Sequence, residues 1–223
     1  MFGLEKYLND LLTSLNNKFE KRLLYVGLQG SYLRNEANVN SDIDIMVIID
    51  EMTIHDLDDY KKILISIGYF EKSCGFICGK SEMANWNPLE VCQLLYTTKD
   101  LYGKLADLVP TYTVEDEKNF IKLSLGNLFH ELCHRYIHSD SEKNISRLPL
   151  TYKSVFFILQ NMYYIKSGTF ITTKQELMNH LTDEDKTVME MAIKLKDNKE
   201  YDFYYAFDVL FTWCQKAIIR ISS

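Results

Sequence analysis

Apolar residues recur at helical spacing near the start of the chain and then gather in two short runs. Residues 4–19 carry leucines three and four positions apart, a pattern that predicts an amphipathic helix. The run over residues 23–28 ends at Gly30 and Ser31, and a β-branched run over residues 41–50 follows. Both runs have the length and composition of buried strands, with a turn between them.

The first half of the chain continues this alternation. Residues 53–67 predict a second amphipathic helix, residues 69–78 a weak strand or hairpin, and residues 89–96 a third clear strand. An order of strand, helix, strand, helix, strand favours a small sheet packed against helices.

After Pro110 only helical periodicity remains. Five segments predict helices there: residues 120–137, 151–166, 174–180, 184–196 and 201–219. We therefore expect an α+β protein of two domains. Residues 1–110 would form a small mixed-sheet domain, and residues 111–223 an all-α helical bundle.

Composition narrows the class of partner. The formal net charge of −6 over 223 residues implies no broad basic surface, so duplex DNA is not an expected partner. The five cysteines are odd in number and lack zinc-ribbon spacing, which favours reduced thiols in a cytoplasmic protein. The first residues do not have the pattern of a secretory signal, and no apolar stretch is long enough to span a membrane.

The residues with the clearest chemistry are Asp42 and Asp44. Side chains alternate along a strand, so both carboxylates project to one side while Ile43 and Ile45 face the other. Two carboxylates on one face repel each other unless they face water or share a cation. Their oxygens suit Mg²⁺ bound together with nucleotide phosphates. A solvated polar edge of a half-buried strand is the alternative interpretation of the pair.

The turn before this strand adds a second feature. A strand followed by Gly30, Ser31 and a helix start offers backbone N–H groups and a hydroxyl to phosphate oxygens. Arg34, one turn further on, would add positive charge. Gly30-Ser31, a spacer and then Asp42-Ile43-Asp44 together resemble the signature of the polymerase-β-like nucleotidyltransferase superfamily. The resemblance implies Mg²⁺ held by the two aspartates and a triphosphate held by the turn.

That superfamily also uses a third carboxylate from a later strand. Glu90, in Pro88-Leu89-Glu90-Val91, is the candidate, because its surroundings are similar to a Leu-Glu-Val strand of the streptomycin and spectinomycin adenylyltransferases. The same resemblance implies that Glu90 is the general base and that Lys174 contacts the nucleotide. The resemblance implies transfer of AMP from ATP to a hydroxyl of a small acceptor such as an aminoglycoside-like antibiotic, with a role in antibiotic resistance.

Several features leave other interpretations open. The segment after Glu90 is shorter than in those enzymes, and their acidic antibiotic-binding position falls at Thr151. Transfer to a protein or RNA hydroxyl, as in toxin–antitoxin systems, and a non-catalytic binding module are alternatives. The helix containing His130, Glu131 and His134 also matches the zinc-protease pattern H-E-x-x-H, and His138 continues the same face. No Gly-x-x-His follows, however, and short motifs recur by chance, so a plain histidine stripe on a bundle helix is the preferred interpretation, with an incidental metal site as a further alternative.

Overall fold

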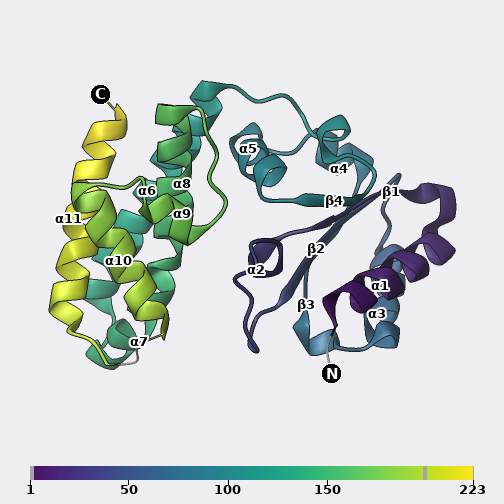
Figure 1. Ribbon diagram of the computed structural model, residues 1–223, viewed down its shortest axis with the longest axis horizontal. Coiled ribbons are helices and arrows are strands. Elements are labelled where there is room, and N and C mark those ends of the chain that lie inside the picture. Colours follow the sequence, from purple (N-terminus) through teal and green to yellow (C-terminus); the bar gives the residue numbers. More distant parts are fainter. Residues whose placement is uncertain (1–2, 198–199, 223) are drawn as a thin grey trace. The chain divides into compact units, whose positions relative to one another are not determined.

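The computed structural model describes residues 3–197 and 200–222 and divides into two compact units. The first unit is Met1–Thr111 and the second is Tyr112–Ser223. Figure 1 shows the strands confined to the first unit and a set of helices in the second. None of the helices among the described residues is long and apolar enough to cross a membrane.

The first unit is built on a four-stranded mixed sheet. Its strands are β1 (Leu23–Leu28), β2 (Ile43–Ile49), β3 (Ser73–Gly79) and β4 (Lys99–Tyr102), in the spatial order β3-β2-β1-β4. Strand β1 pairs antiparallel with β2 and with β4, whereas β2 and β3 run parallel. The predicted α+β class with a small mixed sheet is confirmed.

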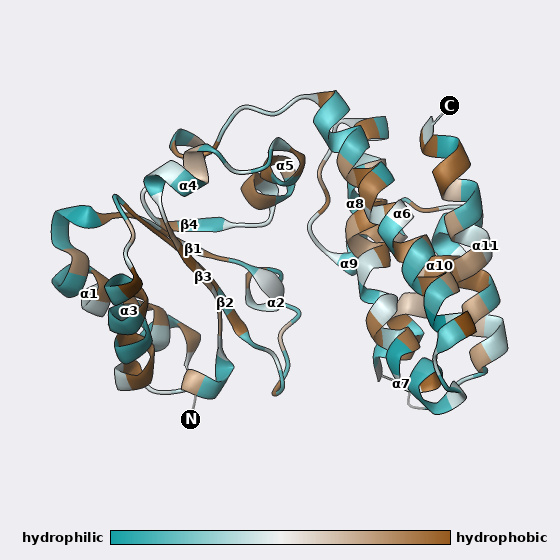
Figure 2. Cartoon of the chain, turned by 180° about the vertical axis from the view of Figure 1, so that it is seen from behind, coloured by the Kyte–Doolittle hydropathy of each residue, from teal (hydrophilic) through white to brown (hydrophobic). Residues whose placement is uncertain are grey.

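Both faces of this sheet are covered. The helices of the unit are α1 (Leu4–Phe19), α2 (Gly30–Leu33), α3 (Ile54–Ile67), α4 (Lys80–Ala84) and α5 (Pro88–Tyr96). Alternate β2 residues from Ile43 to Ile49 pack with apolar residues of α1 and α3. Met46 and Ile48 point the other way and pack with Tyr25, Met83 and Leu105. The apolar colouring of β1 and β2 in Figure 2 reflects this burial on two sides.

The structure corrects the sequence prediction for residues 89–96. This segment is helix α5, not a strand. The side chain of Asn87 caps the helix by accepting a hydrogen bond from the backbone N–H of Leu89 at 3.1 Å, and Pro88 occupies the first helical position. Asn at the N-cap followed by Pro at the first helical position is a sequence typical of the start of a helix. The short strand that follows, β4, has no counterpart in the prediction.

The second unit contains only helices among its described residues. They are α6 (Val114–His138), α7 (Ser141–Thr151), α8 (Lys153–Ser167), α9 (Lys174–Met178), α10 (Asp183–Asp197) and α11 (Phe203–Ser222). The predicted helix over 151–166 begins two residues later, because α7 occupies the preceding segment. Helix α8 ends at Gly168, whose φ of 72° lies in the left-handed region that glycine tolerates best. Trp213, Tyr152 and Phe156 are among the largest side chains buried in the core of this unit.

Candidate functional site

The candidate site lies at the edge of the sheet where β1 ends and β2 and β3 begin. The backbone N–H of Gln29, directly after β1, donates to the carbonyl of Asp44 at 2.8 Å, which joins the turn to the second strand. Helix α2 then begins at Gly30. The chain order predicted from the sequence therefore brings the Gly30-Ser31 turn and the Asp42-Asp44 pair together.

Gly30 is required here by its conformation and by its neighbour. Its φ is 71°, and a Cβ built on it would lie 1.9 Å from Oδ2 of Asp44. Any side chain at this position would therefore displace the Asp44 carboxylate. The glycine allows the backbone of the turn to approach the carboxylate directly. Ser31, the next residue, lies half-buried in the first turn of α2.

Asp44 and Asp42 differ in burial. Asp44 is half-buried, and Asp42, just before β2, is exposed. Burial raises the pKa of the Asp44 carboxyl, and the charge of Asp42 raises it further, whereas a hydrogen bond with Cys74 and the charge of Arg34 act in the opposite direction. A cation bound between the two carboxylates would favour their charged forms.

The donor set fits Mg²⁺. Asp42 and Asp44 supply hard carboxylate oxygens, and Mg²⁺ in nucleotide sites is commonly held by one or two carboxylates together with substrate phosphates and water. Within residues 3–197 and 200–222, no group of three or more histidine, cysteine, aspartate or glutamate side chains is placed to hold a metal by itself. The two aspartates would thus form a partial coordination shell that phosphate oxygens complete.

Arg34 lies beside this pair but is already engaged. It follows α2, and its Nε lies 3.1 Å from Oε2 of Glu36 in a largely buried ion pair. The Arg34 charge still lowers the pKa of Asp44. A phosphate would therefore compete with Glu36 for this guanidinium. The sequence analysis predicted the charge of Arg34 but not its ion pair with Glu36.

Glu90 is not placed as predicted. It lies in the first turn of helix α5, its side chain is exposed, and its carboxylate accepts a hydrogen bond from Trp86 Nε1 at 2.7 Å. The Trp86 ring stacks on Phe76 with a centroid distance of 5.6 Å. Phe76 pairs with Met46 in the register of β3 and β2, and it packs on the sheet face that Met46 shares with Asp44. Glu90 is therefore linked, through Trp86 and Phe76, to the sheet face that carries Asp44. It comes from a helix, however, and not from the predicted strand.

The strand position next to Asp44 holds a cysteine. Cys74 of β3 is the register partner of Asp44, and the two side chains share a hydrogen bond. Strand β3, from Ser73 to Gly79, contains no acidic residue. The sequence analysis missed Cys74, because the limits and direction of β3 were not resolved by the weak apolar pattern there.

A further carboxylate on this face is structural. Asp100 of β4 pairs with Gly27, itself the register partner of Met46. The Asp100 carboxylate accepts a hydrogen bond from the hydroxyl of Tyr25 at 2.7 Å and one from the N–H of Leu105 at 3.4 Å. These bonds tie β4 to its neighbour and to the following turn.

The remaining predicted residues lie in the second unit. Lys174 is the first residue of α9, and its Nζ lies 5.6 Å from the centre of the Phe156 ring. The rings of His130 and His134 are 6.0 Å apart on the exposed side of α6, and Glu131 is bound to Arg135 at 2.6 Å. A glutamate held in this ion pair does not suit the general-base role of a zinc protease.

Comparison with known proteins agrees with this geometry. Residues 8–76 match the family model of the nucleotidyltransferase domain. The match spans α1 to the middle of β3, so it contains the Gly30-Ser31 turn and both aspartates. The predicted resemblance to the nucleotidyltransferase superfamily is confirmed.

Solved structures extend the likeness in fold. A crystal structure of the spectinomycin adenyltransferase AAD(9) from Enterococcus faecialis with ATP and spectinomycin aligns with a TM-score of 0.60 at 15% identity, covering 99% of this chain and 100% of that one. A toxin–antitoxin structure with AMP-PNP gives a TM-score of 0.34 at 23% identity, over 58% of this chain and 92% of that one, which is too low to support an argument. No curated protein matches the chain.

Proposed function

We propose that this protein is a Mg²⁺-dependent adenylyltransferase that moves AMP from ATP to a hydroxyl of a small acceptor. The observation that carries the proposal is the close approach of Gly30 to the Asp44 carboxylate, on which the charge of Asp42 also acts. In this proposal the turn binds phosphate, and the carboxylates beside it bind the metal. The match to the nucleotidyltransferase domain supports the same reaction class.

Each residue of the turn and the strand has a distinct task in this proposal. Asp42 and Asp44 would hold the metal, whose charge would offset that of the triphosphate. Gly30 and Ser31 would contact phosphate oxygens through backbone N–H groups and the serine hydroxyl. Much of the acceleration would come from fixed positioning and from charge complementarity at the reacting phosphate.

Glu90 is the proposed proton acceptor. The acceptor hydroxyl would attack the α-phosphorus, the new O–P bond would form as the bond to the leaving pyrophosphate breaks, and the hydroxyl proton would pass to the Glu90 carboxylate. The hydrogen bond from Trp86 would keep this carboxylate oriented while leaving its second oxygen available. Lys174 is the proposed nucleotide contact from the second unit.

The acceptor class follows from the relative and from the local chemistry. The similar structure contains ATP and spectinomycin, which supports an aminoglycoside-like antibiotic as acceptor and a role in resistance. Thr151, at the position expected to be acidic, accepts a hydrogen bond from Arg135 at 2.7 Å and donates one to Glu131. The Glu131 carboxylate there is neutralised by Arg135, so a strongly cationic acceptor would lack a free carboxylate at this point. This observation argues against a polycationic acceptor at this point, and a protein or RNA hydroxyl is the second candidate.

The test is pyrophosphate release from ATP with Mg²⁺ across an acceptor panel of spectinomycin, streptomycin, an unstructured RNA and a serine-containing peptide. The wild type should release pyrophosphate with one acceptor class, and Asp42→Asn should abolish release. Asp58→Asn, an exposed aspartate of α3, is the matched control and should retain full activity. Calorimetry of Mg²⁺-ATP binding separates the outcomes: binding without transfer supports a non-catalytic module, and no binding overturns the proposal. Assay of cell fractions for the protein tests the expected cytoplasmic location.

A further inference from the structure

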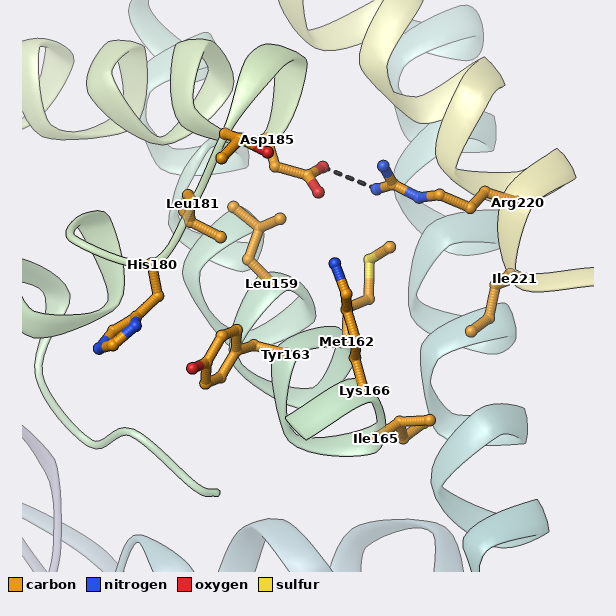
Figure 3. A pocket seen from close by; sticks show the side chains of 11 residues that line it. Leu159, Met162, Tyr163, Ile165, Lys166, His180, Leu181, Asp185, Arg220 and Ile221 are labelled. Atoms are coloured by element: carbon orange, nitrogen blue, oxygen red, sulfur yellow. Dashed lines mark hydrogen bonds and ion pairs between the residues drawn. The ribbon is translucent and has the colours of Figure 1, made fainter. Parts of the chain in front are cut away.

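A pocket in the second unit lies between the C-terminal half of α8, the start of α10 and the end of α11. Its volume is about 270 Å³. Ligand pockets in proteins run from about 300 to 1,000 Å³, so this one suits a small ligand. Figure 3 shows the side chains of these three segments turned toward one another around the space.

The wall of the pocket is mainly apolar. Leu159, Met162 and Ile165 come from α8, Leu181 from the segment before α10, and Ile221 from α11. Removal of water from such a wall favours the apolar part of a ligand. A wholly polar ligand, such as a free metal ion or a sugar, would leave these side chains uncovered.

The charged groups of the pocket are two cations, Lys166 and Arg220, and one anion, Asp185. Arg220 lies 2.7 Å from Oδ1 of Asp185, and the same oxygen accepts a hydrogen bond from Trp213 Nε1 at 2.7 Å. The Asp185 charge is thus already compensated, because both of these donors point at it. Lys166 comes from α8 and has no ion-pair partner among the residues that the structure describes.

Lys166 therefore decides the sign of the net charge at the pocket. One lysine and one arginine against one aspartate leave a single positive charge at the pocket, in a chain whose net charge is −6. Figure 3 shows the Lys166 side chain extending from α8 toward the side where Asp185 and Arg220 meet. A carboxylate placed there would pair with Lys166 and lie near Arg220.

We propose that this pocket is a second ligand site, which binds a small amphipathic monoanion: a carboxylate joined to an aromatic or short aliphatic body. The apolar body would contact α8 and Ile221, and the carboxylate would pair with Lys166. The Tyr163 hydroxyl and the exposed His180, whose rings lie 5.2 Å apart, flank the opening and offer further hydrogen bonds. The site does not depend on the proposed transfer reaction, because none of the residues that line it has a part in that reaction as proposed.

The test uses three probes of one shape and different charge: 3-phenylpropanoate, 3-phenylpropanamide and 3-phenylpropylamine. Calorimetry is done on the full chain without ATP or divalent metal. The carboxylate should bind saturably at one site per chain, and the amide and the amine should bind at least about tenfold more weakly. Equal binding of all three probes, preference for the amine, or no saturation by the carboxylate would each overturn the proposal.

Two variants locate the binding. Lys166→Gln should weaken the carboxylate about fivefold to tenfold and leave the amide unchanged, since only the charge is lost. Lys194→Gln, an exposed lysine of α10 outside the pocket, is the matched control and should bind as the wild type does. Met162→Trp should fill the space and weaken both probes. Carboxylate binding that is unaffected by both pocket variants would contradict the assignment.

Discussion

The two ends of strand β2 carry aspartates in opposite electrostatic settings. At the far end, Arg22 binds Asp50 at 3.0 Å and the buried Asp56 at 2.9 Å. Hydrogen bonds from Arg22, together with those from Thr53, hold the pKa of Asp56 well below its usual range. At the near end, burial raises the pKa of Asp44, and the hydrogen bond with Cys74 and the charge of Arg34 offset this only in part.

The difference separates a structural carboxylate, Asp56, from a candidate ligand-binding carboxylate, Asp44. Asp56 has every partner that it needs within the fold, including both halves of the capping box at the start of α3. Asp44 lies half-buried beside a second carboxylate, an arrangement that costs free energy in the absence of a cation. Sites that retain such a cost are candidates for ligand binding, because the ligand supplies the missing charge. The comparison can be tested by the same Asp→Asn substitution at both ends.

The largest expected effect is on activity. Asp44→Asn should lower kcat/KM for AMP transfer by about 10³-fold or more, because the variant loses a metal-binding oxygen and its charge. Asp56→Asn, assayed well below its melting temperature, should retain activity within about twofold of the wild type. Steady-state pyrophosphate release measures both. If Asp44→Asn kept wild-type activity, the near end of β2 would not be the active site.

The second effect is on stability, and here the loss is expected at Asp56 and not at Asp44. Asp56→Asn should lower the free energy of unfolding by about 2 kcal/mol at pH 7, since Arg22 loses its buried partner. Because the folded-state pKa of Asp56 is lowered, its contribution is complete above the unfolded pKa of about 3.9 and is lost as the pH falls below it. Urea unfolding at pH 7 and pH 3 should show the gap between wild type and variant shrinking in acid. A gap independent of pH would show that the ion pair contributes little.

The sequence predicts the local structure around Asp44 well and the local structure around Glu90, the proposed base, poorly. Asp42, Asp44 and Gly30 lie close together in the chain, and the alternation of side chains along a strand predicts a common face for the two aspartates. The predicted position of Glu90 depended on the secondary structure assigned to residues 89–96. This run is short and apolar, and its periodicity does not distinguish a buried strand from a helix. The decisive signal was local: Asn87 followed by Pro88 caps and starts a helix. The pairing of Cys74 with Asp44 follows from a parallel register that no local pattern specifies.

A third effect tests the contact between the turn and the strand. Gly30→Ala should weaken Mg²⁺-ATP binding about tenfold, because the added methyl would displace the Asp44 carboxylate. It should also lower stability by about 1 kcal/mol through the left-handed φ of 71°. Gly168→Ala, at a similar φ of 72° with open space around its Cβ, is the matched control: it carries the same backbone strain and should leave nucleotide binding unchanged. Equal binding losses in both variants would point to strain alone.

The smallest expected effect is a gain in stability from Asp44→Asn, which tests directly whether the two aspartates differ in electrostatic setting. Asp44→Asn should raise the free energy of unfolding at pH 7 by up to about 1 kcal/mol, whereas Asp56→Asn lowers it, because the neutral amide avoids both desolvation and repulsion from Asp42. A raised folded-state pKa means that the destabilisation is present at pH values above that pKa and absent below about pH 3.9, where the carboxyl is protonated in both states. The stabilisation should therefore disappear in acid. It should also shrink at pH 7 when Mg²⁺ is added, since bound metal stabilises only the wild type; urea unfolding with and without Mg²⁺ measures this. An increase that persisted unchanged at pH 3 would mean that the amide packs better than the carboxyl, and that the charge of Asp44 is not the cause.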